Sequence, residues 1–178
     1  GYGWVPKPGT QAAIRKNISA RCCILRRTDA GVEASKNYSR RYLTLPPDLR
    51  KKYDQAEEGF ELDGIETIWQ TVKYQWLRQI CGGFIDKTPV WNGKADEIVS
   101  LLTGELRKQP VVIWFNYNQE LSLVAQALKK AKITNTYIDG SIPTEERENR
   151  RKLWARGGFQ AFLVQQAVAQ TGMNLSHA

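Results

Sequence analysis

The fold is decided by the stretch Phe162-Leu-Val-Gln-Gln-Ala-Val-Ala-Gln-Thr-Gly-Met-Asn-Leu-Ser-His-Ala178, in which an apolar run meets a polar turn that contains glycine. We expect Gln160-Ala-Phe-Leu-Val164 to be a buried strand that passes into this turn rather than directly into a helix. In parallel α/β sheets, ligands bind beside the carboxyl ends of strands. The turn after Val164 is therefore a candidate ligand site.

Two further apolar runs precede this stretch, and helical patterns lie between them. Val111-Val-Ile-Trp-Phe115 is unbroken, as expected of a strand covered on both faces, and Thr136-Tyr-Ile-Asp139 is the next predicted strand. The helix between these two strands carries apolar residues at Leu121, Val124 and Leu128. A charged helix follows from Thr144, which we expect to cap it, to Trp154. Alternating strands and helices predict an α/β fold with right-handed connections, a parallel sheet and helices on both faces.

Upstream of residue 111 the patterns are mostly helical. Residues 40–45 resemble a strand that ends at Pro46-Pro47, after which Asp48 is expected to cap a helix running through Tyr53. A longer amphipathic helix is predicted to end at Gly82-Gly83, residues 84–93 are predicted to be a loop, and a helix is predicted from Lys94 to about residue 106. The apolar positions of the longer helix are Ile65, Ile68, Trp69, Val72, Trp76 and Ile80, and Trp69, Trp76, Trp114 and Trp154 are all expected in the core.

The charge of the 178-residue chain is unevenly distributed. Residues 1–52 carry a net charge of +9, and the remainder carries −1, which together give +8. A basic first third indicates a surface that faces a polyanion, and the alternative is a solvated face whose compensating acids lie elsewhere in the protein. The chain begins without Met, so we take it as a fragment. Its three cysteines lack a Cys-x-x-Cys spacing, and no apolar run is long enough to span a membrane, so we expect reduced thiols, no metal site and a cytoplasmic location.

Three strand ends carry the residues best suited to hold a phosphate or a ribose. They are Asn116-Tyr-Asn118, Asp139-Gly-Ser141, and Gln165 through Asn174. In a parallel sheet all three lie along one edge, where amide side chains, glycines and free backbone N–H groups meet an anion. The alternative is that they are ordinary connecting turns, since Asn, Asp and Gly are common in loops for conformational reasons.

Taken in order, the motifs resemble a known family. They are Ile24-Leu-Arg-Arg-Thr-Asp29, Leu45-Pro46, Tyr53, Asn92-Gly-Lys94, Leu101-Leu102, Val111-Val-Ile-Trp-Phe-Asn116, Ile138-Asp-Gly-Ser-Ile-Pro-Thr-Glu-Glu-Arg147, Phe162-Leu-Val164 and Thr171-Gly-Met-Asn-Leu-Ser-His-Ala178. This series is similar to Swi/Snf-type superfamily-two helicase-like ATPases, in a compact bacterial or phage-like form. The resemblance implies the tail of a first RecA-like domain and a linker in residues 1–47, and a helical protrusion in 48–90. It also implies an incomplete second RecA-like, helicase C-terminal domain in 91–178, with a three-layer architecture.

The resemblance also implies a function and site residues. Proteins of this family couple ATP hydrolysis to movement along double-stranded DNA, which we expect here rather than RNA. By the resemblance, Phe115, Asn116, Gln165, Gln166, Arg26 and Arg27 face DNA, and Thr171, Gly172 and Asn174 face the nucleotide. Arg147 either contacts DNA or forms salt bridges with Glu145, Glu146 or Glu148.

Other features depart from the family. Many members carry Ser/Thr-Thr and Gly-Gly where this chain has Gln165-Gln166 and Ala169-Gln170. No phosphate-binding Gly-x-x-x-x-Gly-Lys-Ser/Thr loop occurs in the sequence, and no Asp-Glu-x-His-like magnesium motif does. We therefore expect ATP and Mg²⁺ to be bound mainly through the N-terminal RecA-like domain of the same protein, which would be the partner of this chain. No catalytic residue is assigned here, and the chain alone is expected not to hydrolyse ATP.

Two other classes of function stay open. One is a non-catalytic nucleic-acid-binding or partner-docking module that keeps the RecA-like shape. The other is an unrelated α/β enzyme that acts on a nucleotide or sugar phosphate, for which Asp139 is the residue placed to be a general base.

Overall fold

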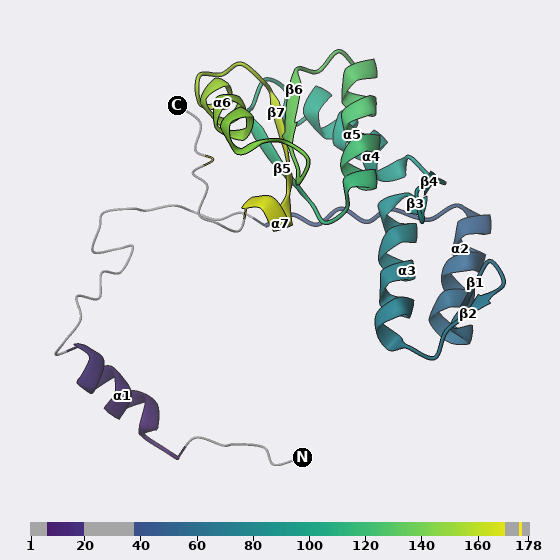
Figure 1. Cartoon of the computed structure of the whole chain (residues 1–178), viewed down its shortest axis with the longest axis horizontal. Helices are drawn as coiled ribbons and strands as arrows, with labels where there is room; N and C mark the ends of the chain where they lie inside the picture. Colours follow the sequence, from purple (N-terminus) through teal and green to yellow (C-terminus); the bar gives the residue numbers. More distant parts are fainter. Residues whose placement is uncertain (1–6, 20–37, 170–174, 176–178) are drawn as a thin grey trace. The chain divides into compact units, whose positions relative to one another are not determined.

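The computed structural model describes residues 7–19, 38–169 and 175. The chain divides into two units, Gly1–Arg41 and Tyr42–Ala178. In the first unit the described regular element is helix α1 (Thr10–Ser19). The remaining elements in Figure 1 belong to the second unit, which holds the sheet and the candidate site. In the described ranges, no helix has the length and apolar character needed to cross a membrane.

A three-stranded parallel sheet forms the centre of the second unit. Its strands are β5 (Val111–Phe115), β6 (Asn135–Ile138) and β7 (Ala161–Gln165), in the order β5-β7-β6. Val111 pairs with Ala161, and Asn135 pairs with the same residue from the other side. The three predicted strands are confirmed, and the last of them in sequence lies in the middle of the sheet.

Helices cover both faces of this sheet (Figure 1), as the sequence predicts. Helices α4 (Gly93–Thr103) and α5 (Asn118–Lys130) pack on one face, where Ala161 and Leu163 of β7 join their apolar residues. Helix α6 (Thr144–Ala155) packs on the other face, where Trp154 meets Phe162 and Val164. Successive side chains of a strand point to opposite faces, so β7 supplies both cores. The chain therefore has the predicted α/β, RecA-like architecture.

Strand β5 is less covered than its apolar sequence predicts. Because β5 lies at an edge of the described sheet, Trp114 is 52% exposed, whereas all four apolar residues of β7 are fully buried. The prediction that β5 is covered on both faces is thus wrong at Trp114, although Val111 and Ile113 pack into one core and Val112 into the other. The prediction that β7 is a buried strand is confirmed. The expected core position of Trp114 is wrong for the same reason, whereas Trp154 is buried as expected.

The segment predicted to be a helical protrusion, residues 48–90, differs from the prediction at its centre, and we keep the name protrusion for this segment. It contains α2 (Pro47–Asp54), the π-helix η1 (Gln55–Gly59), the hairpin strands β1 (Glu61–Leu62) and β2 (Ile65–Glu66), and α3 (Gln70–Gly82). The helix expected from Ile65 to Gly82-Gly83 is confirmed only from Gln70 to Gly82, because the chain reverses between β1 and β2. Asp63 and Gly64 both have positive φ, and Leu62 pairs with Ile65 across the turn. As a result Ile65, Ile68 and Trp69 are exposed instead of lying in the core, and Trp76 is half-buried.

Three smaller expectations also fail. Residues 40–45 form no strand, since no described segment pairs with them. The expected loop 84–93 contains a short hairpin of β3 (Phe84–Ile85) and β4 (Thr88–Pro89). Neither Asp48 nor Thr144 caps its helix, because Pro46 and Pro143 occupy the N-cap positions and the two residues lie inside the first turns of α2 and α6.

Candidate functional site

The carboxyl ends of the three parallel strands meet at one edge of the sheet. Phe115 pairs with Gln165 in the register of β5 and β7, and Ile138 pairs with Val164 in that of β6 and β7. Asn116, Asp139 and Gln165 therefore follow or end neighbouring strands at the same level. This confirms the central geometric prediction from the sequence, and we call this edge the strand-end rim, defined by residues 115–118, 139–142 and 165–166.

Gln165 connects two parts of the rim. Its Oε1 accepts a hydrogen bond of 3.0 Å from the backbone N–H of Gly140, which is 25 residues earlier in the chain. The Gln165 side chain thus fixes the turn after β6 against the end of β7. Its amide nitrogen forms no hydrogen bond with the described residues, so its two N–H donors are available to an acceptor.

Asp139 holds the same turn from within. One carboxylate oxygen accepts hydrogen bonds from the backbone N–H of Ser141 (2.9 Å) and from its hydroxyl (2.6 Å). This is the local side-chain-to-backbone pattern for which Asp is favoured in turns. Asp139 is only 9% exposed. The carboxylate therefore has a conformational role in the turn 139–142, in addition to any chemistry expected of it.

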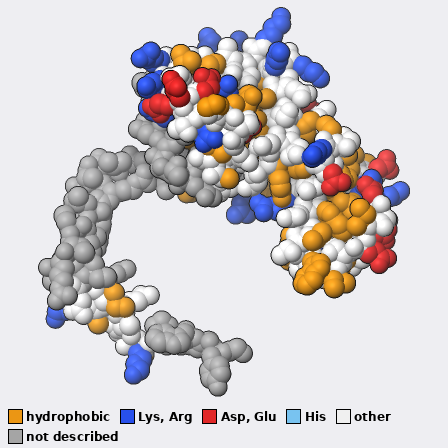
Figure 2. Space-filling model, viewed as in Figure 1, with side chains coloured by type: hydrophobic (Ala, Val, Ile, Leu, Met, Phe, Trp, Pro, Cys, Tyr) orange, Lys and Arg blue, Asp and Glu red, His pale blue; other side chains and the backbone are white. Residues whose placement is uncertain are grey.

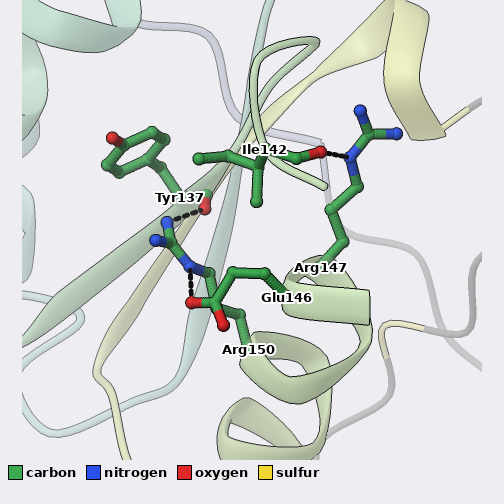
Figure 3. A network of polar contacts seen from close by, with 5 residues as sticks. All are labelled: Tyr137, Ile142, Glu146, Arg147 and Arg150. Atoms are coloured by element: carbon green, nitrogen blue, oxygen red, sulfur yellow. Dashed lines mark hydrogen bonds and ion pairs between the residues drawn. The ribbon is translucent and has the colours of Figure 1, made fainter. Parts of the chain in front are cut away.

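Arg147 braces this turn from α6. Its Nε–H donates to the carbonyl oxygen of Ile142 at 2.6 Å (Figure 3). Its Nη2 donates to the carbonyl oxygen of Gly140 at 3.3 Å. The glutamates around it have other partners: Glu146 pairs with Arg150, and Glu148 pairs with Arg151. The alternative in which Arg147 forms salt bridges with its neighbours is therefore wrong for this side chain, which binds backbone oxygens at the rim.

Arg150 joins α6 to the edge strand β6, and its sequence position alone gave no sign of this. Its Nη1 donates to the carbonyl oxygen of Tyr137 at 2.8 Å, and the guanidinium lies 4.9 Å from the centre of the Tyr137 ring. Glu146 accepts from the Nε of Arg150 at 2.8 Å (Figure 3). The carbonyl of Tyr137 in β6 thus accepts a hydrogen bond from Arg150, a residue that the sequence pattern places only in a basic helix end.

The predicted DNA-facing residues of the rim divide by exposure. Asn116 and Gln166 are exposed, whereas Phe115 is only 3% exposed and packs in the core with α5. The ring of Phe115 therefore supports the rim from below. Gln166 begins a one-turn helix, α7 (Gln166–Ala169), directly after β7, so the expected passage into a turn without a helix is wrong. Arg26, Arg27, Thr171, Gly172 and Asn174 lie outside the described residues.

The protrusion is attached beside the rim by contacts that periodicity does not reveal. Tyr117, next to Asn116, meets Phe84 of β3 edge to face at 5.3 Å, and Arg78 of α3 lies 6.0 Å from the Tyr117 ring. Lys94 at the start of α4 forms an ion pair with Glu120, which is 7% exposed in the first turn of α5. These contacts tie the loop that carries Asn116 to the elements before it.

A groove lies next to the rim, along β6. It has a volume of about 820 Å³ and is lined by α5, β6 and α6, with Asn118 and Asp139 near the rim and Glu146 and Arg150 on α6. No group of three or more His, Cys, Asp or Glu side chains in the described part is arranged to hold a metal ion. The groups that the described rim presents are the side-chain amides of Asn116, Gln165 and Gln166, the carboxylate of Asp139 and backbone N–H groups.

Comparison with known proteins agrees with this geometry. Residues 93–178, just under half of the chain, match the family described as "Helicase conserved C-terminal domain". The matched segment is similar to this helicase domain and includes the whole sheet and the strand-end rim. No curated protein sequence is similar enough to the chain to count as a match.

Two solved structures are similar in part. The C-terminal part of the Fun30 ATPase domain aligns with a TM-score of 0.43 and 18% identity, over 71% of this chain and 47% of that chain. The helicase domain of Pyrococcus furiosus Hef aligns with a TM-score of 0.40 and 16% identity, over 67% of this chain and 25% of that chain. The chain thus spans less than half the length of either structure.

Proposed function

We propose that the chain is the C-terminal motor half of a Swi/Snf-type, ATP-dependent DNA translocase, and that its strand-end rim contacts the phosphates of duplex DNA. The observation that carries the proposal is the meeting of three strand ends at one level. Two exposed amides, Asn116 and Gln166, and the free amide nitrogen of Gln165 lie at this edge. Phosphate oxygens only accept hydrogen bonds, so side-chain amides that donate are suited to them.

The rim is held in a fixed shape before any ligand binds. Gln165, Asp139 and Arg147 each bond to the turn 139–142 through backbone or hydroxyl groups. Donors that are already positioned lose little freedom on binding, which favours contacts that must form and break repeatedly. Contacts to the DNA backbone carry no sequence information, so the proposed track is sequence-independent.

ATP binding and hydrolysis belong, in this proposal, to the complete motor. ATP and Mg²⁺ would be held mainly by an N-terminal RecA-like domain, with Thr171, Gly172 and Asn174 of this chain facing the nucleotide from the second lobe. Closing and opening of the two lobes would move the rim along the phosphates. The chain of residues 1–178 by itself is expected to show no DNA-stimulated ATP hydrolysis, and such activity would contradict this division of roles.

The rim is tested by duplex binding of a double variant, Asn116→Ala with Gln166→Ala. Both side chains are exposed and form no hydrogen bond with the described residues, so the fold is retained. A matched control is Asn149→Ala, an exposed amide on α6. Each lost hydrogen bond is worth at least about 1 kcal/mol, so the affinity for a fluorescein-labelled duplex, measured by anisotropy, is expected to fall about fivefold if one contact is lost and about thirtyfold if both are.

The salt dependence adds a second readout to this experiment. Neutral amides release no counterions, so the slope of log affinity against log salt is expected to stay unchanged in the double variant. Equal affinities of the wild-type chain and the double variant for the duplex would refute the rim as the DNA contact. The same would follow if Asn149→Ala weakened binding as much.

The basic first third of the chain is a separate part of the proposal. Reversing the charge of Arg26, Arg27, Arg40 and Arg41 together is expected to weaken duplex binding and to flatten the salt slope by about 0.9 for each phosphate contact that is lost. An unchanged affinity and slope would show that the net charge of +9 in residues 1–52 does not face DNA.

A further inference from the structure

The protrusion carries an exposed apolar surface that the proposed motor function does not use. Ile65, Ile68 and Trp69 are 62%, 84% and 67% exposed, and Ile68 and Trp69 line a groove of about 710 Å³ together with Phe60, Glu66 and Thr67. We call residues 59–69 the hairpin face. Figure 2 shows hydrophobic side chains gathered on the protrusion next to acidic ones. Scattered exposed apolar residues are normal, but a grouped set beside a groove marks an interaction site.

The backbone under this face is fixed by hydrogen bonds. Thr67 donates its N–H to the Phe60 carbonyl at 2.9 Å, and the Trp69 N–H donates to the Thr67 hydroxyl oxygen at 3.1 Å. The Trp69 carbonyl then accepts from the first turn of α3, from Val72 and Lys73. The exposed side chains are therefore presented from a defined framework, as an anchor site requires.

The sequence that forms the hairpin face and the segment before it is strongly acidic. Residues 54–66 contain six carboxylates and no Lys or Arg. Asp54 pairs with Arg50 and Asp63 with Lys52, whereas the other four form no ion pair with the described residues. Those four are Glu57, Glu58, Glu61 and Glu66, all of them exposed.

Two grooves with different character meet at Gly59. Gly59 lines the apolar groove, and it also lines a second groove of about 550 Å³ whose other lining residues are Lys51, Asp54, Gln55 and Glu58. On the apolar side, the ammonium group of Lys73 lies 4.1 Å from the centre of the Phe60 ring. A ligand lying across Gly59 would meet an apolar pocket on one side and carboxylates on the other.

We propose that the hairpin face binds a basic segment of a partner protein, which inserts an apolar side chain beside Trp69 and places its Lys or Arg residues against Glu58 and Glu66. The charge excludes two other occupants on physical grounds. Nucleic acid would be repelled by the unpaired glutamates, and a second copy docked through the same face would bring like charges together. This site is separate from the strand-end rim, so its failure would leave the DNA proposal intact.

The test is a titration of the isotope-labelled full chain, followed by NMR. The probe is a short synthetic peptide of lysines and arginines around two leucines, and the comparison probe replaces its basic residues with glutamate. The basic peptide is expected to shift the backbone resonances of Gly59 and Phe60 and the indole resonance of Trp69. Trp69→Ala is expected to weaken binding about tenfold or more, as for an anchor aromatic residue, and Glu58→Gln with Glu66→Gln about threefold to tenfold.

Matched controls make each outcome decisive. Trp114→Ala removes a tryptophan of similar exposure outside the hairpin face and is expected to leave peptide affinity unchanged. Trp69 is exposed, so its variant keeps the fold, which the unchanged spectrum of the remaining residues verifies. The proposal is overturned if the basic peptide does not bind, if the acidic peptide binds equally well, or if duplex DNA shifts the same resonances. It is also overturned if sedimentation shows a dimer of the chain that Trp69→Ala dissociates.

Discussion

Replacing Arg147 by alanine gives the sharpest test of how the rim is held together. The guanidinium of Arg147 makes one short hydrogen bond to the Ile142 carbonyl and one longer bond to the Gly140 carbonyl. A hydrogen bond that involves a charged group contributes about 1.5–3 kcal/mol, and the half-buried position of Arg147 favours the lower end. We therefore expect Arg147→Ala to lower the free energy of unfolding by about 1.5–2 kcal/mol.

The assay is urea unfolding, with amide hydrogen exchange as the local readout. With a slope of about 2 kcal/mol/M, the unfolding midpoint is expected to fall by about 0.7–1 M, and amide exchange in the turn 139–142 is expected to accelerate. Arg156→Ala is the matched control, because this exposed arginine at the end of the same helix contacts none of those carbonyls. Its change is expected to stay within about 0.5 kcal/mol. The reasoning is wrong if both variants lose the same stability, or if exchange in the turn stays unchanged in Arg147→Ala.

Three further predictions concern the core, the protrusion junction and a thiol. Phe162→Ala should lower the free energy of unfolding by about 3–5 kcal/mol, measured by heat or urea, because the buried ring packs against β5, β6 and Trp154 of α6. Trp114→Ala should cost far less, and equal losses would contradict the assigned burial. Lys94→Ala should cost about 2 kcal/mol because it leaves the buried carboxylate of Glu120 unpaired, and adding Glu120→Gln should recover part of that loss; no recovery would mean that the ion pair is not the cause. Cys81 is exposed, but desolvation by the atoms packed around its sulfur raises the pKa of the thiol. In a variant with the other cysteines replaced by serine, its alkylation at neutral pH should therefore be slower than that of a free thiol; a rate equal to the free thiol would refute this.

The strand-end rim was predictable from sequence because it depends on local patterns and one general rule. The apolar runs at 111–115, 136–139 and 160–164 mark buried strands, and helical patterns between them require parallel pairing. Parallel strands place their carboxyl ends together, so Asn116, Asp139 and Gln165 meet whatever the strand order is. The match of residues 93–178 to the helicase C-terminal domain agrees with the motif order read from the sequence.

Sequence patterns failed where a side chain's surroundings depend on distant residues. The steps of three and four from Ile65 to Ile80 fit one long helix, but positive φ at Asp63 and Gly64 makes a hairpin and leaves Trp69 exposed. The apolar spacing is the same for a single buried helix face and for the exposed hairpin that the structure has. The spacing alone therefore cannot distinguish an exposed apolar surface from a face that packs in the core.

The sequence by itself determined the α/β class, the parallel sheet and the edge where the three strands end, because each follows from periodicity within short segments. Only the tertiary structure decided that β7 is central and that Phe115 is buried beneath the rim. It also decided that Arg147 binds backbone carbonyls, and that Arg150 binds one in addition to Glu146. The physical reason is that hydrogen bonding and burial are set by which segments meet in space, and these segments lie far apart along the chain.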